Sequence, residues 1–365
     1  MIRIQNIYHM LAYAFSVLNE KGYRDVAAEE FDNAAELLAA ILAHGVSVQL
    51  KRGLGREYAQ RADELSTLRG KIDIPESLKT RALLKRQMVC MYDEFTIDSK
   101  LNRIVKATLA LLVRSDISKG RKKELRKLLV FFSDVADVDV HDIDWNLRYD
   151  RNNQTYRMLV AVCELVVKGL LQTQGDGSMR MMDFLDEQRM YRLYERFILE
   201  YYRKEHPDLN AAAIQIPWAL DDGFGDMLPI MQTDITLQRG GRVLIIDAKY
   251  YSHTLQGQYD ARTVHSGNLY QIFTYVKNEE AKLAGDPHEV SGMLLYARTD
   301  EEAQPDGMYR MSGNRISVKT LDLNRPFSEI CGQLDGIAFD HFGDNEVRRR
   351  PRRVNLRESF DSSMD

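Results

Sequence analysis

The stretch Met231-Gln-Thr-Asp-Ile-Thr-Leu-Gln-Arg-Gly-Gly-Arg-Val-Leu-Ile-Ile-Asp-Ala-Lys249 indicates how the C-terminal half of the chain folds. Gly240-Gly241 suits the tight turn of a β-hairpin, and the residues on either side of it have strand composition. With the turn at these glycines, the register across the hairpin sets Asp234 opposite Asp247. Because side chains alternate along a strand, Lys249 joins the same face two positions later.

Two carboxylates in cross-strand positions repel each other, so a fold that keeps them there is expected to hold a cation between them. Hard oxygen ligands with open positions suit Mg²⁺, and the nearby ammonium group could orient a water or stabilise charge on a phosphate. The alternative is an Asp–Lys–Asp charge cluster on a solvated sheet face. The run from Val243 to Ile246 is apolar on both faces, which favours a buried strand with Asp247 and Lys249 where it ends.

The chain has 365 residues, which suits two domains, with 44% hydrophobic and 28% charged residues as in globular proteins. Its three cysteines are far apart, which indicates a reducing compartment and no zinc site. We found neither a signal peptide nor an apolar run of membrane-spanning length, so we expect a cytoplasmic protein. The net charge is −4, so any basic face for DNA must be local, or most DNA affinity must come from a partner.

The first domain is predicted to be α+β, to cover residues 1–172 and to end at the polar, glycine-containing stretch 172–178. Asn6 is a candidate cap of its first helix, and Asp32 or Asn33 of its second. The basic run 119–127 is either a solvated helix face or a contact for DNA or a partner. The expected helices cover 7–18, 34–42, 99–113, 119–127 and 154–171, and the expected strands 46–50 and 69–74.

The second domain is predicted to cover residues 173–345 and to have an α/β core with a mixed sheet flanked by helices. We expect a helix at 186–204, a strand at 214–218, the hairpin, a helix at 268–277 and a strand at 291–296. Residues 346–365 are basic and then acidic, and are predicted to be a disordered tail whose arginines could touch DNA.

Three further residues could complete the site. Glu195 shares an apolar-aromatic helix face, where a carboxylate needs a metal or water as a partner unless it reaches solvent at the edge. Gln271 and Tyr275 lie one turn apart and are expected, with Asn268, to project away from the face by which the later helix packs. Plain solvent exposure is the alternative for this pair.

The pattern Asp234…Asp247-x-Lys249 resembles the PD-(D/E)xK nuclease signature, with Pro229 five residues before the first aspartate. Nucleases of this kind often carry a Gln-x-x-x-Tyr pair beside the metal. The chain is similar over nearly its whole length to the McrC family, the nuclease subunits of McrBC modification-dependent restriction systems. The blocks that carry this resemblance are 6–14, 69–72, 102–109, 228–229, 233–236, 246–251 and 265–271.

The resemblance implies an N-terminal domain that docks on a McrB-like AAA+ GTPase ring and stimulates its GTP hydrolysis, followed by a PD-(D/E)xK endonuclease domain. McrB, not this chain, would bind GTP and recognise 5-methylcytosine in double-stranded DNA. Asp234, Asp247 and the backbone carbonyl of Ala248 would bind Mg²⁺. Lys249 would position or help deprotonate the attacking water.

In this scheme Gln271 and Tyr275 would line the pocket, and Glu195 is a further candidate catalytic residue. Two other functions remain open. The chain could be a non-catalytic GTPase activator and assembly subunit with a merely structural Asp/Lys cluster. It could also be a self-sufficient nuclease for branched or damaged DNA, which would cut with Mg²⁺ and no partner.

Overall fold

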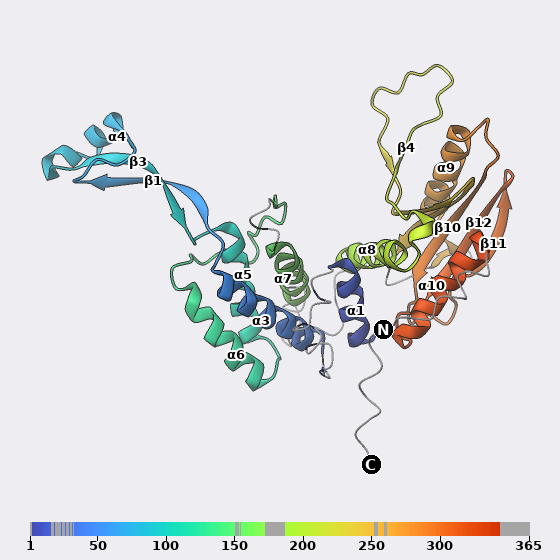
Figure 1. Ribbon diagram of the computed structural model, residues 1–365, viewed down its shortest axis with the longest axis horizontal. Coiled ribbons are helices and arrows are strands. Elements are labelled where there is room, and N and C mark those ends of the chain that lie inside the picture. Colours follow the sequence, from blue (N-terminus) through green and yellow to red (C-terminus); the bar gives the residue numbers. More distant parts are fainter. Residues whose placement is uncertain are drawn as a thin grey trace, which may run out of the picture. The chain divides into compact units, whose positions relative to one another are not determined.

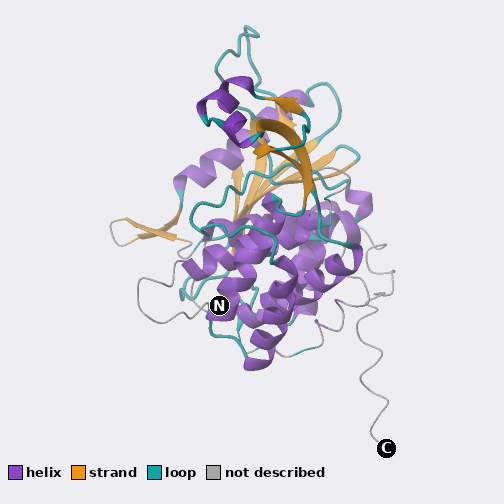
Figure 2. Cartoon of the chain, turned by 90° about the vertical axis from the view of Figure 1, so that its left-hand side faces the viewer, coloured by secondary structure: helices purple, strands orange, loops and turns teal. Residues whose placement is uncertain are grey.

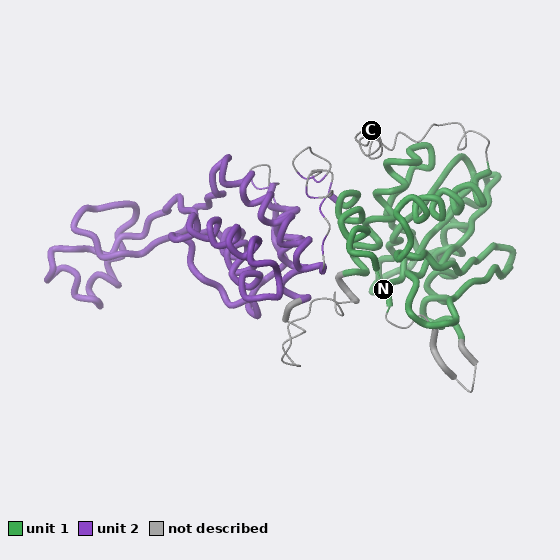
Figure 3. Tube along the Cα trace, turned by 90° about the horizontal axis from the view of Figure 1, so that it is seen from below, with its two compact units in different colours: residues 1–14, 190–365 green, residues 15–189 purple. Residues whose placement is uncertain are grey.

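The computed structural model of the protein describes residues 2–15, 18, 23, 26, 29, 31, 33–149, 153, 155–171, 187–251, 255–258 and 261–343. The chain divides into two compact units. One unit combines residues 1–14 with 190–365, and the other comprises residues 15–189 (Figure 3). The predicted boundary at 172 and the predicted tail at 346–365 lie outside the described residues.

The first helix, α1 (Ile4–Ala14), belongs to the C-terminal unit, whereas we expected it in the N-terminal domain. Asn6 does not cap this helix but lies inside it and is buried. Its Nδ2 donates to the backbone carbonyls of Leu323 (2.7 Å) and Arg325 (2.8 Å). This contact spans more than 300 residues of sequence, so a local capping pattern could not reveal it.

Helices α3 (Ala34–Arg52), α5 (Lys100–Arg114), α6 (Lys119–Leu129) and α7 (Tyr156–Leu171) form the body of the unit 15–189 (Figure 1). Figure 2 distinguishes the helices of the chain from its strands and loops. The predicted helices 99–113, 119–127 and 154–171 are confirmed within a few residues. Asn33, one of the two predicted caps, accepts from the backbone N–H of Glu36 at 2.8 Å.

The strand predicted at 46–50 is wrong, because α3 continues to Arg52. The alternation of Val46, Val48 and Leu50 imitates a strand, but Val46 also continues the buried stripe of Leu38 and Leu42 at four-residue spacing. By length and hydropathy alone, α3 is the one helix among the described residues that could cross a membrane, and 67% of its apolar window is buried, as in a core helix.

An arm leaves the helical body between α3 and α5 (Figure 1). Strands β1 (Glu57–Leu65) and β3 (Met88–Thr96) pair antiparallel along their whole lengths, and neither was predicted. The far part of the arm holds β2 (Lys71–Ile72), α4 (Ile74–Lys79) and the 3-10 helix η2 (Ala82–Lys85). The strand expected at 69–74 shrinks to β2.

Asp73 is the reason that β2 is short. Its side chain accepts from the N–H of Glu76 at 3.0 Å and starts α4, with Pro75 in the first turn. A proline at this position fits a helix start because the missing N–H has no partner there anyway.

The root of the arm is held by one buried amide. The Nδ2 of Asn102 donates to the carbonyls of Gly55 (2.8 Å) and Ile97 (2.7 Å), just before β1 and just after β3. Tyr156 donates from its hydroxyl to Oδ1 of Asn102 (2.6 Å) and accepts from the N–H of Gly55 (2.8 Å). Every N–H and O–H donor of this network has a partner, so the network fixes where both strands leave the body.

The C-terminal unit contains a five-stranded mixed sheet in the order β11-β12-β10-β7-β6, which confirms the predicted fold class. Strands β7, β10 and β12 are parallel, and β6 and β11 pair antiparallel at the two edges. The strands are β6 (Ile235–Arg239), β7 (Arg242–Lys249), β10 (Glu289–Ala297), β11 (Gly307–Met311) and β12 (Asn314–Leu321).

Two short strand pairs and three long helices complete this unit. The pairs are β4 (Gln215–Ile216) with β5 (Met231–Gln232) and β8 (Leu255–Gln258) with β9 (Ala261–Val264). The helices are α8 (Glu187–Glu205), α9 (Ser266–Lys282) and α10 (Phe327–Phe342), and 3-10 helices cover Val130–Phe132 (η3) and Pro207–Leu209 (η5). The predicted helices 186–204 and 268–277 correspond to α8 and α9.

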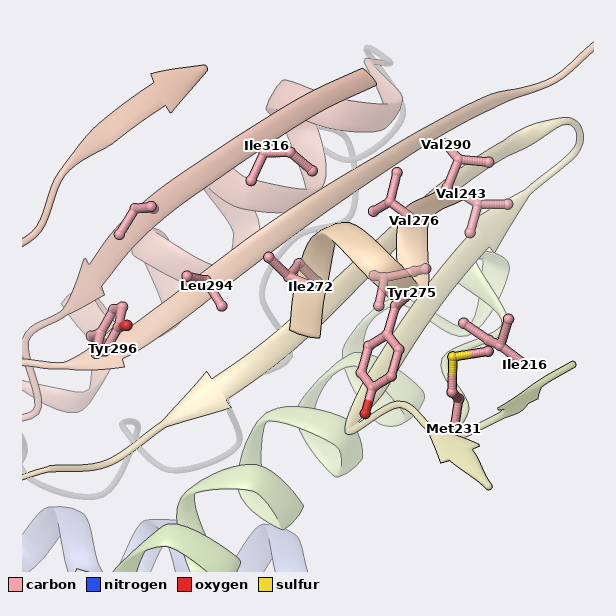
Figure 4. Close-up of a cluster of buried hydrophobic side chains, with 12 residues drawn as sticks. Ile216, Met231, Val243, Ile272, Tyr275, Val276, Val290, Leu294, Tyr296 and Ile316 are labelled. Carbon is pink, nitrogen blue, oxygen red and sulfur yellow. The ribbon is translucent and has the colours of Figure 1, made fainter. Parts of the chain in front are cut away.

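Helix α9 packs on one face of the sheet through a buried cluster that includes Val243, Ile245, Ile272 and Val276 (Figure 4). A Cβ at Gly292 of β10 would lie 2.8 Å from side-chain carbons of Ile272 and Val276, so the helix rests directly on the strand. Because side chains alternate along β7, the two residues that follow Ile245 on this face are Asp247 and Lys249. The fold therefore directs both toward α9.

Candidate active site

The hairpin has the register that the sequence predicts. Gly240 has a φ of 59° and lies in the turn with Gly241, and Ile235 pairs with Ile246. Asp234 occupies a bend immediately before β6. Because Ile235 pairs with Ile246, extending the register by one residue sets Asp234 opposite Asp247. Its Oδ2 accepts the backbone N–H of Ala248 at 2.9 Å, which ties the carboxylate to the end of β7.

Asp247 and Lys249 form a buried ion pair. Nζ of Lys249 lies 2.8 Å from Oδ2 of Asp247, and the side chains of the lysine and the aspartate are 7% and 1% exposed, respectively. The ammonium also donates to Oε1 of Gln271 at 3.3 Å. The two aspartates and the lysine, predicted from spacing, are therefore together in space.

Burial dominates the electrostatics of the carboxyl groups. It raises the pKa of Asp247 to about 7; Lys249 opposes this rise and the Asp234 carboxylate adds to it. Burial also raises the pKa of Asp234, against the effects of Lys249 and of the Ala248 N–H. Burial works to lower the pKa of Lys249, but the two aspartates outweigh it and raise that pKa. The pair thus consists of a firmly protonated lysine beside carboxyl groups that bind protons more readily than usual.

Both carboxylate oxygens of Asp247 are buried without a geometric hydrogen bond to a described residue; Oδ2 has the ion pair with Lys249 at 2.8 Å, and Oδ1 has no such pair. A buried carboxylate oxygen without a partner is costly, and a bound cation would relieve that cost. No group of three His, Cys, Asp or Glu side chains in the described part of the chain could hold a metal. Two carboxylates still suit Mg²⁺, which keeps several waters and takes substrate phosphate oxygens as further ligands.

The backbone of Ala248 offers a third oxygen on the same side. Thr236 exchanges both of its backbone hydrogen bonds with Ala212, so Ile235 directs its own N–H and C=O toward Ile246 of β7. Backbone groups two residues apart in a strand point the same way, so the N–H and C=O of Ala248 point, like those of Ile246, toward the side of β6. The hydrogen bond from the Ala248 N–H to Asp234 agrees with this direction. The donor set of Asp234, Asp247 and the Ala248 carbonyl fits a hard divalent cation.

The prediction that Tyr275 and Asn268 point away from the packing face of α9 is wrong. The buried residues of α9 are Asn268, Ile272, Tyr275, Val276 and Glu279. The ring of Tyr275 belongs to the core cluster, and its hydroxyl reaches beyond that cluster toward β5 (Figure 4). Asn268 lies four positions before Ile272 and Tyr275 three positions after it, so both share the buried face of Ile272. The sequence interpretation assigned them to the other face because both are polar.

Tyr275 and Gln271 nevertheless reach the predicted site. Nε2 of Gln271 donates to the Tyr275 hydroxyl at 2.9 Å, and that hydroxyl donates to the carbonyl of Gln232 at 3.0 Å. Gln271 thereby holds its Oε1 toward Lys249. The glutamine touches the charged cluster directly, whereas the tyrosine positions the glutamine.

Glu195 of α8 is partly buried near the same carboxylates. Burial, followed by the Asp234 carboxylate, raises the pKa of Glu195 to about 7, and Lys249 opposes the rise. No hydrogen bond or ion pair of this side chain with another described residue is present. The structure therefore brings Glu195 into electrostatic contact with the site without making it a direct partner of the lysine.

The sequence analysis missed Tyr191, one turn before Glu195 on α8. Its hydroxyl lies 3.3 Å from Oδ2 of Asp234, and Nζ of Lys249 lies 5.8 Å from the centroid of its ring. Burial, followed by the nearby carboxylates, raises the pKa of Tyr191 well above its usual value. The four-residue spacing from Glu195 was the available signal, since it places both on one helix face.

Comparison with known proteins gives consistent relatives. Residues 4–297 match the family described as McrBC 5-methylcytosine restriction system component. The chain is 27% identical over 347 residues to the type IV methyl-directed restriction enzyme EcoKMcrBC of Escherichia coli strain K12, which covers 93% of this chain and 98% of that protein.

Two solved assemblies from Thermococcus gammatolerans contain similar chains. One is a refined half-complex from the tetradecameric assembly of McrB AAA+ hexamers with bound McrC, with 18% identity and a TM-score of 0.45 over 90% of this chain and 76% of that chain. The other is the cryo-EM structure of the McrBC complex, with 20% identity and a TM-score of 0.39 over 55% of this chain and 58% of that chain.

Proposed function

Because this chain belongs to the McrBC 5-methylcytosine restriction system component family, we propose that it is the Mg²⁺-dependent DNA endonuclease subunit of such a system. The observation that carries the proposal is the buried cluster of Asp234, Asp247 and Lys249, in which Oδ1 of Asp247 has no partner among the described residues. A merely structural ion pair gains little from such an unpaired oxygen.

In the proposed reaction a water attacks a phosphodiester in line with the leaving oxygen. Asp234, Asp247 and the carbonyl of Ala248 would hold Mg²⁺, which supplies Lewis-acid stabilisation of the phosphate and a more acidic water when bound. The protonated Lys249 orients the water and stabilises negative charge that develops on the phosphate oxygens. We favour this positioning role because an ammonium group donates hydrogen bonds and cannot accept a proton.

The other predicted residues act around this centre. Gln271 holds the ammonium group of Lys249, and Tyr275 holds Gln271. Glu195 adds a carboxyl group that changes its protonation state near neutral pH. Because the site is desolvated, each of these interactions is stronger than it would be at the surface.

We further propose that the chain works in the cytoplasm with a McrB-like AAA+ GTPase ring, whose GTP hydrolysis it stimulates through the unit of residues 15–189. The family description names a system component, and the net charge of −4 fits a subunit that receives modified double-stranded DNA from a partner. Recognition of 5-methylcytosine would then belong to the partner.

The test mixes wild-type protein or the Asp247→Ala variant with the cognate GTPase, GTP, Mg²⁺ and methylated duplex DNA. We expect the variant to lose cleavage and to keep GTPase stimulation, because Asp247 lies in the unit that does not carry the proposed docking role. Asp98→Ala, a matched loss of one carboxylate from the other unit, should keep cleavage.

Undiminished cutting by Asp247→Ala would refute the nuclease site and leave the activator function. Mg²⁺-dependent cutting by the wild-type chain without GTPase or GTP would instead support the self-sufficient nuclease.

A further inference from the structure

Helix α6 separates its cations onto two faces. Arg121 faces inward with a side chain only 15% exposed, and carboxylates of Glu29 (2.8 Å), Glu36 (3.4 Å) and Glu124 (2.7 Å) surround it. Leu125 and Leu128 are buried on this same side of the helix. Arg121 therefore forms internal ion pairs. Because the inward face of α6 is fixed by these contacts, the residues on the opposite side of the helix face outward.

The outward face is strongly basic. Lys119, Lys123, Arg126 and Lys127 are exposed and follow one side of α6 at helical spacing. None of the four forms an ion pair with another residue that the structure describes. The side continues into η3 with Val130 and Phe131, and we call these six residues the α6 basic face.

Two large apolar side chains distinguish this face from an ordinary solvated one. Val130 is 72% exposed and Phe131 is 60% exposed, although both adjoin the four cations. Exposed apolar side chains occur elsewhere on this chain, so the feature that favours a contact surface here is their position beside four cations that have no ion-pair partner among the described residues. Exposed carboxylates, Asp116 and Asp134, flank the two ends of the face.

The charge of this face selects its partner. Because the whole chain has a net charge of −4, any contact that this subunit itself makes with the DNA backbone needs a local cationic surface. Exposed cations of the C-terminal unit are partly neutralised, as Arg298 and Arg325 both pair with Asp322. Six of the nine residues from 119 to 127 are cationic, and the four on the outward face have no ion-pair partner in the part of the chain that the structure describes.

We propose that the α6 basic face binds the phosphate backbone of double-stranded DNA, an inference that rests on the proposed nuclease function. From Lys119 to Lys127 the helix rises about 12 Å, over which one DNA strand carries roughly three to four phosphates. The four cations make non-specific contacts to these phosphates, and Phe131 and Val130 pack on the adjacent sugars. Such contacts position the duplex without reading its sequence.

The test compares two variants that each remove two positive charges and leave a net charge of −6 (−4 − 2). Lys123→Gln/Lys127→Gln alters the α6 basic face, and Lys51→Gln/Arg52→Gln alters the exposed end of α3. Binding of the full chain to a short fluorescent duplex is measured by anisotropy in EDTA at several salt concentrations. The slope of log K against log salt should fall by about 1.8 for the α6 variant, with affinity weaker by roughly 10–100-fold at moderate salt.

The α3 variant should change neither the affinity nor the slope by a comparable amount. Phe131→Ser should weaken binding without changing the slope, because it removes no charge. Equal effects of the two double variants, or absence of duplex binding by the wild-type chain, would overturn the proposal. So would a result in which the α6 variant binds DNA normally and fails to stimulate the partner GTPase, which would assign the face to an acidic protein surface.

The binding experiment is independent of the proposed nuclease function. It is carried out without divalent metal, so it does not require a working Asp247. A chain that binds duplex through α6 but does not cut methylated duplex when the cognate GTPase, GTP and Mg²⁺ are all present would refute the nuclease and support the binding surface. If the chain cuts DNA but the α6 variant binds duplex with the same salt dependence as wild type, the nuclease is supported and the binding surface is refuted.

Discussion

Two aspartate–cation pairs of this molecule have nearly the same length and opposite electrostatics. Asp247 lies 2.8 Å from Lys249 in the C-terminal unit, and Asp98 lies 2.7 Å from Arg103 in the other. Burial raises the pKa of Asp247 to about 7, whereas hydrogen bonds from Arg103 lower the pKa of Asp98 to about 2. Distance between the charges therefore does not decide the behaviour of either pair.

Solvation and hydrogen bonding account for the difference. Arg103 is 40% exposed and donates twice to Asp98, at 2.7 Å each, and the N–H of Ala136 adds a third bond at 2.8 Å. Asp247 is 1% exposed, and its Oδ1 has no partner among the described residues. Asp98 is held by three hydrogen bonds, whereas Asp247 keeps a buried oxygen without a partner, which costs stability and lies where we propose that a metal binds.

The largest difference in cleavage rate is expected between the variants that remove Lys249 and Arg103, the cations of the two pairs. Lys249→Ala should lower the rate of DNA cleavage by about 10²–10³-fold, because it removes a donor that stabilises developing charge in a desolvated site. Binding of Mn²⁺, followed by titration calorimetry, should persist. Arg103→Ala is the control and should keep the cleavage rate. A lysine variant as active as wild type would disprove the role assigned to Lys249.

Bound divalent metal should offset the loss of stability that ionisation of the buried Asp247 carboxyl group causes. A carboxyl group whose pKa is raised on folding contributes stability below about pH 4 and loses it as pH rises toward its folded value of about 7. The metal-free protein should thus lose several degrees of melting temperature over this range relative to Asp247→Asn. Saturating Mg²⁺ at about one hundred times its Kd should restore about 2.7 kcal/mol in the wild type only.

These effects are measured by thermal unfolding in EDTA and in Mg²⁺ across the pH range. Equal pH dependence of wild type and Asp247→Asn would show that this carboxyl group does not titrate with a raised pKa. Equal stabilisation of both proteins by Mg²⁺ would show that the ion binds elsewhere.

The opposite pH response is expected for Asp98. Its pKa is lowered on folding, so its stabilising effect is present above about pH 4 and disappears as pH falls toward about 2. Asp98→Asn should lower the free energy of unfolding by about 1–2 kcal/mol at neutral pH, because charge-assisted hydrogen bonds are lost. Urea unfolding at neutral and at strongly acidic pH checks this, and the difference between the proteins should nearly vanish in acid.

The smallest effect on cleavage is expected from substitution of Gln271. Its side chain accepts a hydrogen bond from Lys249 of the Asp247–Lys249 pair. Gln271→Ala removes the 3.3 Å bond to Lys249 and should slow cleavage by about two- to tenfold, the value of one hydrogen bond. Metal affinity should stay unchanged. A loss as large as that of Lys249→Ala would mean that Gln271 touches the substrate itself.

The sequence predicted the hairpin because its determinants are local. A two-residue glycine turn fixes the pairing of the adjoining strands, and a one-residue slip would reverse every buried side chain. Asp234, Asp247 and Lys249 could therefore be placed together from their spacing. Amphipathic helices with serine caps, such as α5 after Ser99, were predictable for the same reason.

The arm was not predictable because most of β1 is exposed on both faces and has no alternating pattern, and its stability comes from pairing with β3 more than 20 residues later. The root network of Asn102 is equally non-local, since two of its three partners lie 47 residues before it and 54 residues after it. A single-sequence pattern contains no information on such pairings until the chain folds.

By itself, the sequence determined which ionisable groups meet at the hairpin and therefore what chemistry they can support. Only the tertiary structure decided their state. Packing of α8 and α9 around the end of β7 removes water from Asp247, directs Gln271 to Lys249 and brings Tyr191 to Asp234. The physical reason is that a register follows from neighbours along the chain, whereas desolvation depends on elements that are distant in sequence and adjacent only in the fold.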